Sequence, residues 1–313
     1  MPMNELFELW EKSVSAEYMI AGWQQWADAG AVSSGLPQYL VEHTGATRVG
    51  EIKPDSFYLF QVPGTHDLLR PVVKLSEGHR EAYERRRNEF YYSERDGGGF
   101  LTFLGEEPHL NEERYADAFF DAVEQLGVRR VAAVAGVYGR VPYDRDRDIS
   151  CVYSLPGMKE ELAQYALRFS NYEGGATISS YLAERAEPRG VEFFTFYAFV
   201  PSYDFSELSS KLSSKLSVSV QAVAVGEDYK AWYDIMRRLD HMFDLGLDLS
   251  DLREQSDELI ASWDSKIEHV AMTMPDLEIR EYMHEVDSEF TEMPFEPLGD
   301  VWEDALRDLF DDL

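Results

Sequence analysis

The segment from residue 100 to about residue 137 constrains the fold most, because it predicts a strand, a helix and a second strand in succession. FLTFLG (100–105) is an apolar strand, and RVAAVAGV (130–137) is another. Between them, apolar side chains recur at spacings of three and four, at Tyr115, Phe119, Ala122, Val123 and Leu126. Asn111 is a good N-cap for this helix, and Gly127 suits its end. A strand–helix–strand unit favours parallel strands and an α/β fold.

Strands and helices alternate through much of the chain. YMIAGW (18–23) and VEFFTFYAFV (191–200) are apolar runs that suit buried strands. Three further strands are predicted from aromatic and β-branched residues, in FYLFQV (57–62), PVVKL (71–75) and EFYYSE (89–94). SEGHREAYERRRN (76–88) is highly charged and predicts either an exposed excursion or a short helix. The alternation indicates a three-layer α/β/α sandwich.

The remaining elements of that domain continue the pattern. A helix is predicted over 31–43, a strand in SCVYS (150–154), and a helix near 158–168. A glycine loop at 171–175 then opens another helix. We therefore place an α/β/α core domain at residues 1–225.

An acidic helical module is predicted at residues 226–313. Helices are expected from Ser250, from Pro275, and over 301–309. VSVQAVAV (218–225), just before this module, is the one candidate strand after residue 204. Residues 244–313 hold 22 acidic and 4 basic side chains, a net charge of −18 within a total of −30.

The net negative charge of the chain limits the kinds of macromolecule that it is expected to bind. An acidic surface repels phosphate backbones and anionic lipid, which argues against nucleic-acid or membrane binding. It fits either a basic protein partner or a soluble acidic surface. Cys151 is the single cysteine and is predicted to be a buried thiol, which suits a reducing cytoplasm. No signal peptide and no membrane-spanning run is predicted.

No motif of a known catalytic class is present. The sequence has no nucleophile elbow, phosphate loop or zinc signature, and its seven histidines lack ligand spacing. We therefore expect no metal and no cofactor.

Two acidic side chains follow predicted parallel strands, where ligands bind in α/β sheets. Asp28 and Gly30 lie in the loop after residues 18–23, and Asp28 either hydrogen-bonds a ligand or ties down the turn. Glu107 closes the strand 100–105, and either faces a cleft or lies where the following helix begins.

Four more residues complete the candidate pocket. Arg145 holds an anion or pairs with the neighbouring aspartates. Tyr172 and Gly174 precede a helix, where free N–H groups bind an anion or the glycine makes a tight turn. Tyr203 covers the pocket or packs in the core.

The order of several short motifs resembles the proteasome assembly chaperone 2 family. These motifs are AGWQQWADAG, Phe60-Gln61, Arg70-Pro71, Gly105 to Pro108, Val141-Pro142 with Arg145, Tyr172 to Gly175, and Pro201 to Tyr203. The resemblance covers roughly residues 18–250. Gly175 replaces the usual proline of that family, and Tyr143-Asp144 replaces a commoner histidine–threonine pair.

The resemblance implies a nucleoside-phosphorylase-like fold with a C-terminal helical extension, and homo-oligomers, with a trimer favoured. It also implies a non-catalytic assembly or chaperone-like role with a protein partner. The tail, Asp311-Asp312-Leu313, lacks the hydrophobic–tyrosine–any sequence by which relatives dock on the proteasome. The alternative is a small-molecule binder, or a hydrolase- or phosphorylase-like enzyme, that uses the candidate pocket.

Overall fold

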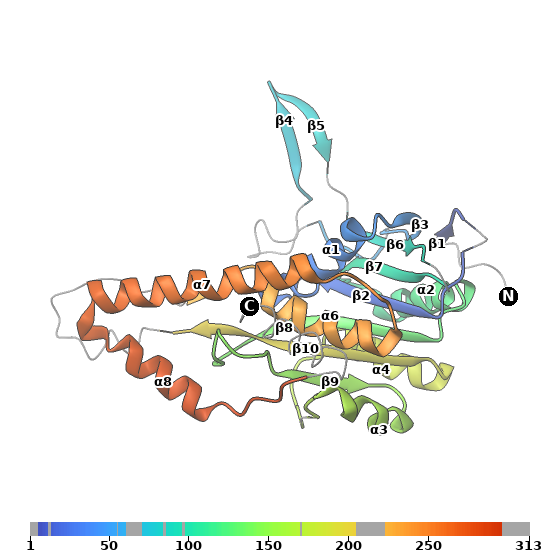
Figure 1. Cartoon of the computed structure of the whole chain (residues 1–313). Coiled ribbons are helices and arrows are strands. Elements are labelled where there is room, and N and C mark those ends of the chain that lie inside the picture. Colours follow the sequence, from blue (N-terminus) through green and yellow to red (C-terminus); the bar gives the residue numbers. More distant parts are fainter. Residues whose placement is uncertain are drawn as a thin grey trace, which may run out of the picture. The chain divides into compact units, whose positions relative to one another are not determined.

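The computed structural model describes residues 6–11, 14–54, 56–60, 71–83, 86–95, 98–169, 171–204 and 223–295 (Figure 1). The chain groups into two compact units. The first contains Met1–Gly136, Cys151–Met158 and Asn171–Tyr197, and the second contains Val137–Ser150, Lys159–Ser170 and Ala198–Leu313. The predicted division into domains 1–225 and 226–313 stays a prediction.

A mixed sheet forms the centre of the first unit. Its strand order is β1-β3-β6-β7-β2-β8-β10, and β9 pairs with β10. The strands are β1 (Phe7–Leu9), β2 (Tyr18–Gln24), β3 (Thr47–Ile52), β6 (Asn88–Ser93), β7 (Phe100–Glu106), β8 (Arg130–Gly139), β9 (Ile149–Tyr153) and β10 (Glu192–Tyr203).

The predicted strand–helix–strand unit is confirmed. It consists of β7, α2 (Glu112–Gln125) and β8, and both strands are parallel to β2. Strands β7 and β8 are not paired with each other, because β2 lies between them. Ala21 of β2 pairs with Phe103 of β7 on one side and with Ala133 of β8 on the other. Gly127 ends the segment with a φ of 71°, which glycine adopts without strain.

Helices cover both faces of this sheet, as the three-layer prediction requires. On one face, Met19, Ala21 and Trp23 of β2 share a core with α2 and with α4 (Ile178–Ala186). The opposite face lies against α1 (Gly35–His43), since a Cβ on Gly22 would come within 2.0 Å of the Ser33 carbonyl oxygen and 2.7 Å of Pro37. The fold is therefore α/β with a large mixed sheet.

One strand prediction in this unit is wrong. FYLFQV is no strand over its described residues 57–60, because Phe57 packs its ring edge-on against Tyr115 and its carbonyl accepts the N–H groups of His109 and Leu110. Of the two alternatives for the charged segment 76–88, its described residues match the exposed excursion and not the helix. Its residues His79–Tyr83 are strand β5, which pairs with β4 (Val73–Ser76) in a separate two-stranded hairpin.

The predicted position of the N-cap at Asn111 is confirmed, but a side-chain cap is not formed. Asn111 precedes α2 but has a left-handed backbone, and its side chain makes no capping hydrogen bond. The side-chain amide instead donates to the Ser56 carbonyl, 2.7 Å away. Strands β1 and β3 were not predicted, because β1 has only three residues and β3 contains no aromatic residue.

The second unit contains the C-terminal helices. They are α6 (Tyr229–Phe243), α7 (Ser250–Thr273), the 3₁₀ turn η5 (Pro275–Leu277) and α8 (Ile279–Glu289). The outer end of β10 pairs here with β11 (Val223–Ala224). The helices expected from Ser250 and Pro275 are thus present, whereas residues 301–309 lie outside the described residues.

Two helical predictions in this unit need correction. The helix expected near 158–168 is only α3 (Lys159–Leu162), between the 3₁₀ turns η2 (Pro156–Met158) and η3 (Ala163–Tyr165), since Ala166 takes a left-handed backbone conformation. Helix α6 was not predicted. Within the described part of the chain, no helix combines the length and the hydropathy needed to cross a membrane.

Candidate functional site

Asp28 ties down the loop that joins β2 to α1. Its Oδ1 accepts hydrogen bonds from the Ser33 and Ser34 N–H groups and from the Ser33 hydroxyl, at 2.9–3.0 Å. Burial raises the pKa of Asp28, although these hydrogen bonds act in the opposite direction. The geometry matches the turn-forming alternative for this carboxylate.

Gly30 lies in the same loop, which approaches the end of β8 closely. Gly30 has a φ of 63°, in the left-handed region that favours glycine. The Gly136 N–H donates to the Ala27 carbonyl at 2.8 Å, and a Cβ on Gly136 would lie 2.0 Å from the Ala29 carbonyl oxygen. Gly136 is thus a requirement of this loop that the sequence did not indicate.

Glu107 caps a helix that comes from a distant part of the chain. Its Oε1 accepts the N–H of Ile178, the first residue of α4, at 2.8 Å. Burial raises the pKa of Glu107, while the N–H groups of Ile178 and Trp26 lower it. An anion at this helix start would therefore meet a carboxylate that already fills the position.

The glycine loop before α4 places its two candidates at the surface. Tyr172 is 76% exposed, and its hydroxyl makes a 3.4 Å contact with the Gly175 carbonyl oxygen. Gly174 lies under that ring, since a Cβ there would lie 2.3 Å from the Tyr172 hydroxyl. Thr177 is the N-cap of α4, and its side-chain oxygen accepts a hydrogen bond from the Ser180 N–H.

Arg145 belongs to the second unit, and its partners are acidic residues near the C-terminus. Its Nε lies 3.1 Å from Asp287 Oδ1, and its Nη1 lies 3.8 Å from Glu292 Oε2. The side chain is 43% exposed. The ion-pair alternative for Arg145 thus has its partners more than 140 positions away, and not among the adjacent aspartates.

Tyr203 is a core residue of the second unit. Its side chain is fully buried, and its hydroxyl donates to the Val141 carbonyl at 2.7 Å. The ring packs edge-on against Trp263 of α7 and Tyr282 of α8. Burial raises the pKa of the phenol.

The seven candidate residues therefore divide between the two units. The first unit holds Asp28, Gly30, Glu107, Tyr172 and Gly174, and the second holds Arg145 and Tyr203. Within the first unit, Asp28 and Glu107 each follow a predicted strand. The structure makes these strands parallel neighbours, because Gln24 of β2 is opposite Glu106 of β7.

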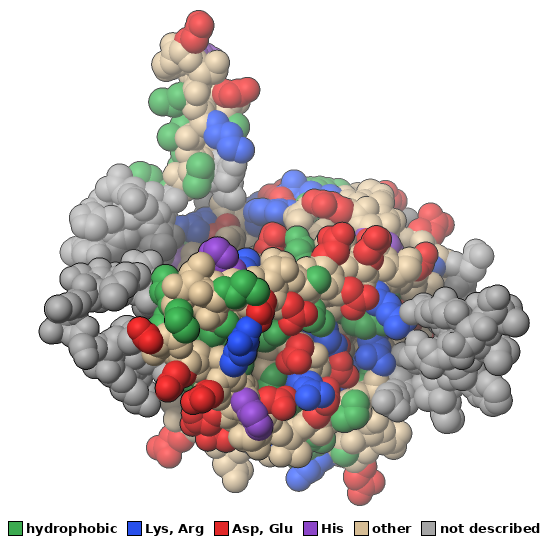
Figure 2. Space-filling model, turned by 60° about the vertical axis from the view of Figure 1, so that its left-hand side comes forward, with side chains coloured by type: hydrophobic (Ala, Val, Ile, Leu, Met, Phe, Trp, Pro, Cys, Tyr) green, Lys and Arg blue, Asp and Glu red, His purple; other side chains and the backbone are tan. Residues whose placement is uncertain are grey.

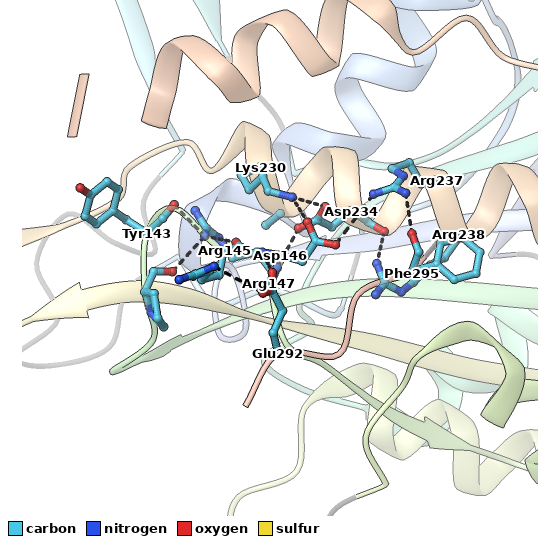
Figure 3. A network of polar contacts seen from close by, with 12 residues as sticks. Tyr143, Arg145, Asp146, Arg147, Lys230, Asp234, Arg237, Arg238, Glu292 and Phe295 are labelled. Carbon is cyan, nitrogen blue, oxygen red and sulfur yellow. Dashed lines mark hydrogen bonds and ion pairs between the residues drawn. The ribbon is translucent and has the colours of Figure 1, made fainter. Parts of the chain in front are cut away.

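A buried charge network in the second unit was not predicted from the sequence (Figure 3). It joins the loop between β8 and β9 to one face of α6. We define it by six residues that carry three acidic and three basic groups: Asp146, Arg147, Asp228, Lys230, Asp234 and Arg238.

Arg147 forms the centre of this network. Its guanidinium makes two bonds to Asp228, Nε to Oδ2 at 2.9 Å and Nη2 to Oδ1 at 3.1 Å. Its Nη1 lies within 3.2 Å of the carbonyl oxygens of Pro142, Tyr143 and Arg145. This one side chain therefore fixes the course of the whole loop.

Helix α6 supplies the opposite side of the network. Asp228 caps its first turn by accepting the Ala231 N–H, and Lys230 reaches both Asp146 and Asp234. Burial alone would lower the pKa of Lys230, but the charges of Asp234 and Asp146 outweigh it and raise that pKa. Lys230 is accordingly a cation in the folded protein.

A sequence signal for the network exists. Lys230, Asp234 and Arg238 follow one another at spacings of four, on one helix face, behind the N-cap Asp228. The loop sequence DRDRD (144–148) supplies charges to match. A charged stripe of this kind ordinarily indicates a helix face exposed to solvent. Its burial depends on contacts with the loop between β8 and β9, which the helix sequence alone does not indicate.

The described residues contain no cluster of three or more histidine, cysteine or acidic side chains placed to hold a metal ion. Cys151 is buried, and burial raises the pKa of its thiol. The side chains described above thus form structural bonds, with no group arranged as a nucleophile and its base.

The sequence of residues 22–265 matches the family model described as the PAC2 family. The chain belongs to the PAC2 family. That match covers all seven candidate residues and most of both units.

Solved structures agree with the PAC2 fold. A PAC2 family protein from Streptomyces avermitilis superposes with a TM-score of 0.66 at 22% identity, over 85% of this chain and 98% of the other. The proteasome-assembly chaperone homologue Rv2125 of Mycobacterium tuberculosis gives a TM-score of 0.64 at 20% identity, over 80% and 94%.

An archaeal structure is similar as well. Pyrococcus furiosus PbaB, described as an archaeal proteasome activator, gives a TM-score of 0.57 at 15% identity, over 84% of this chain and 98% of PbaB. At these identities the likeness supports the fold alone. A search of curated proteins found no match to this sequence.

Proposed function

We propose that this PAC2-family protein is a non-catalytic, cytoplasmic assembly or chaperone-like protein that forms a homo-oligomer and binds another protein chain. The observation that carries the proposal is the β4–β5 hairpin of the first unit, whose apolar side chains are exposed. Membership of the family supports the same role, because relatives include a proteasome-assembly chaperone homologue and a proteasome activator.

The hairpin has an apolar side of its own. Val73 and Tyr83 are directly opposite each other across the two strands, and Leu75 follows Val73 on the same side. Their exposed fractions are 49%, 45% and 61%. Figure 2 shows green apolar side chains along this hairpin, beside charged ones.

A hairpin of this kind is unfavourable when its apolar side chains are exposed to water. An isolated two-stranded hairpin is marginally stable, and exposed strand edges and apolar faces favour pairing with another chain. A protein partner that covers Val73, Leu75 and Tyr83 would remove these apolar groups from water. The proposal therefore assigns the hairpin as the contact with a protein partner.

The test is to purify the tagged full-length protein from its own source and to analyse it by native mass spectrometry. We expect a complex that contains a second protein, and we expect Leu75→Asp to remove it. Ser76→Asp is the matched control, because Ser76 is exposed on the same strand but outside the apolar side. A wild-type protein that carries no protein partner, or a partner that Leu75→Asp retains, would contradict the proposal.

A second function has one observation in its favour. Asp28 and Glu107 place two partly buried carboxyl groups, both with raised pKa values, after neighbouring parallel strands. Raised carboxyl pKa values are typical of ligand and catalytic sites. On this alternative, the same native mass spectra show a retained small molecule that Asp28→Asn releases, and its absence excludes a tightly held ligand.

A further inference from the structure

We propose that the C-terminal strap, residues 279–295, exchanges between two copies of this chain, so that the strap of one copy occupies the arginine surface of the other. The strap comprises α8 and the segment that follows it to Phe295. The arginine surface comprises four residues of the second unit: Arg140, Arg145, Arg168 and Arg237. The inference does not depend on the hairpin or its partner.

Arg140 of the arginine surface contacts helix α8 of the strap. Its Nη2 lies 3.2 Å from Glu285 Oε1, and its Nη1 forms an ion pair with Glu289. Its guanidinium also lies over the Tyr282 ring, 5.0 Å from the centroid. Glu285 and Glu289 are one helical turn apart, so both face the same arginine.

The strap continues along the same loop and then onto α6. Arg145 pairs with Asp287 and Glu292, and the Asp146 N–H donates to Glu292 at 3.1 Å. Arg168 then donates to the Thr291 carbonyl, and Arg237 donates to the Phe295 carbonyl. Each of these contacts joins a base of the surface to an acid or carbonyl of the strap, apart from the Asp146 N–H. Outside the arginine surface, Arg280 of the strap pairs with Glu268 of α7.

These pairs are individually weak. The side chains of Glu285, Asp287 and Glu289 are 45–61% exposed, and ion pairs between exposed groups are screened by salt. The strap therefore leaves the arginine surface more readily as the salt concentration rises.

The buried apolar side chains of the strap determine which surface a detached strap binds. Ile279, Val286 and Phe295 are at most 6% exposed. A detached strap would expose all three side chains to water, which is unfavourable. An identical surface exists on every other copy of the chain, so a second copy is the occupant we assign.

The segment before α8 is suited to such an exchange. Helices α7 and α8 are joined by the turn η5 and by Glu278, whose φ of 49° places a non-glycine residue in the left-handed region. A short connection held in a strained conformation favours domain swapping, because a different path between the helices relieves the strain.

The test uses two full-length variants with reversed charges. Variant A carries Arg140→Glu and Arg145→Glu, and variant B carries Glu285→Arg, Asp287→Arg and Glu289→Arg. Within either variant alone, strap and surface repel each other. In an A–B pair with exchanged straps, both straps meet a surface of opposite charge.

We expect native mass spectrometry of the mixture to show A–B dimers well above the 1:2:1 ratio of random pairing. A mixture at or below that ratio would overturn the proposal. The chain that carries all five changes is the control for folding, because it restores opposite charges within one copy, and its circular dichroism should match that of the wild type.

A second measurement needs no substitution. Wild-type copies with heavy and light isotopes are mixed, exposed to 1 M NaCl and returned to low salt. We expect mixed dimers after the high-salt step and fewer in a sample kept at low salt throughout. A mixture in which the high-salt step adds no mixed dimers would also overturn the proposal.

Discussion

Arg147 and Asp228 form a two-point ion pair in which both side chains are at most 1% exposed. They lie 81 positions apart, so the pair joins the loop after β8 to the start of α6. A charge this deeply buried is stable only beside its partner, because neither group can be solvated by water. The pair therefore makes the loop conformation depend on helix α6.

Replacing Asp228 with alanine should destabilise the second unit by about 3–5 kcal/mol, since the change leaves Arg147 buried without its counter-charge. The first turn of α6 loses its cap as well. Urea denaturation followed by circular dichroism measures the free energy of unfolding. Glu227→Ala, one residue earlier and exposed, is the control and should change it by less than about 0.5 kcal/mol. Equal effects of the two changes would contradict the assigned role.

Asp146 should make the protein sensitive to acid. Burial alone would raise the pKa of Asp146, but the charges of Lys230 and Arg237 outweigh it and lower that pKa. A lowered folded-state pKa gives stability that is full above the unfolded value of about 3.9 and is lost as the pH falls through the folded value. In urea titrations, the stability difference between wild type and Asp146→Asn should be constant near neutral pH and shrink in acid. A difference that grows in acid would show the opposite sign.

Glu107 should behave in the reverse way. Its raised pKa means that its contribution to stability is greatest below the unfolded value of about 4.3 and declines as the pH rises through the folded value. Glu107→Gln keeps an oxygen to accept the Ile178 N–H but carries no charge. The variant should therefore gain stability relative to wild type as the pH rises above about 4.3, as measured by thermal unfolding. A gap that does not vary with pH would mean that Glu107 titrates normally.

Adding a methyl group at Gly136 should destabilise the first unit by about 1–3 kcal/mol or more, because the new Cβ would lie 2.0 Å from the backbone oxygen of Ala29. Backbone atoms cannot move aside as a flexible side chain can. Gly157→Ala is the matched control, since nothing lies within 4 Å of a Cβ there. Differential scanning calorimetry of the two variants should show a lower Tm for Gly136→Ala alone.

Tyr203→Phe separates a core role from a pocket role. The change leaves the buried Val141 carbonyl without its donor and should cost about 1–3 kcal/mol of stability. If Tyr203 instead covered a ligand site, stability would be nearly unchanged and only ligand binding would respond. Guanidinium denaturation of the variant distinguishes these outcomes.

The sequence predicts the first unit well where periodicity is strong and local. The β7–α2–β8 unit follows from apolar spacing within one short stretch, and the topology rule then makes its strands parallel. FYLFQV shows the limit of the method, because aromatic content favours a strand while the packing of Phe57 on Tyr115 decides otherwise.

The candidate site also combines features that the sequence predicts with features that tertiary contacts determine. Asp28 and Glu107 each follow a strand, as predicted, and these strands are neighbours in the structure. Their bonding partners come from Ser33, Ser34 and Ile178, and the partners of Arg145 come from near the C-terminus. Such pairings are set by tertiary contacts over long sequence separations, which no local pattern encodes.

The position of β2 between β7 and β8 has a consequence for synthesis. Met19 pairs with Leu101 and with Val131, so the central strand is made long before either neighbour. At roughly 5–20 residues per second, β2 leaves the ribosome several seconds ahead of β7. A nascent chain that ends before residue 130 lacks β8 and leaves one edge of this apolar strand unpaired, which makes the early chain prone to aggregation.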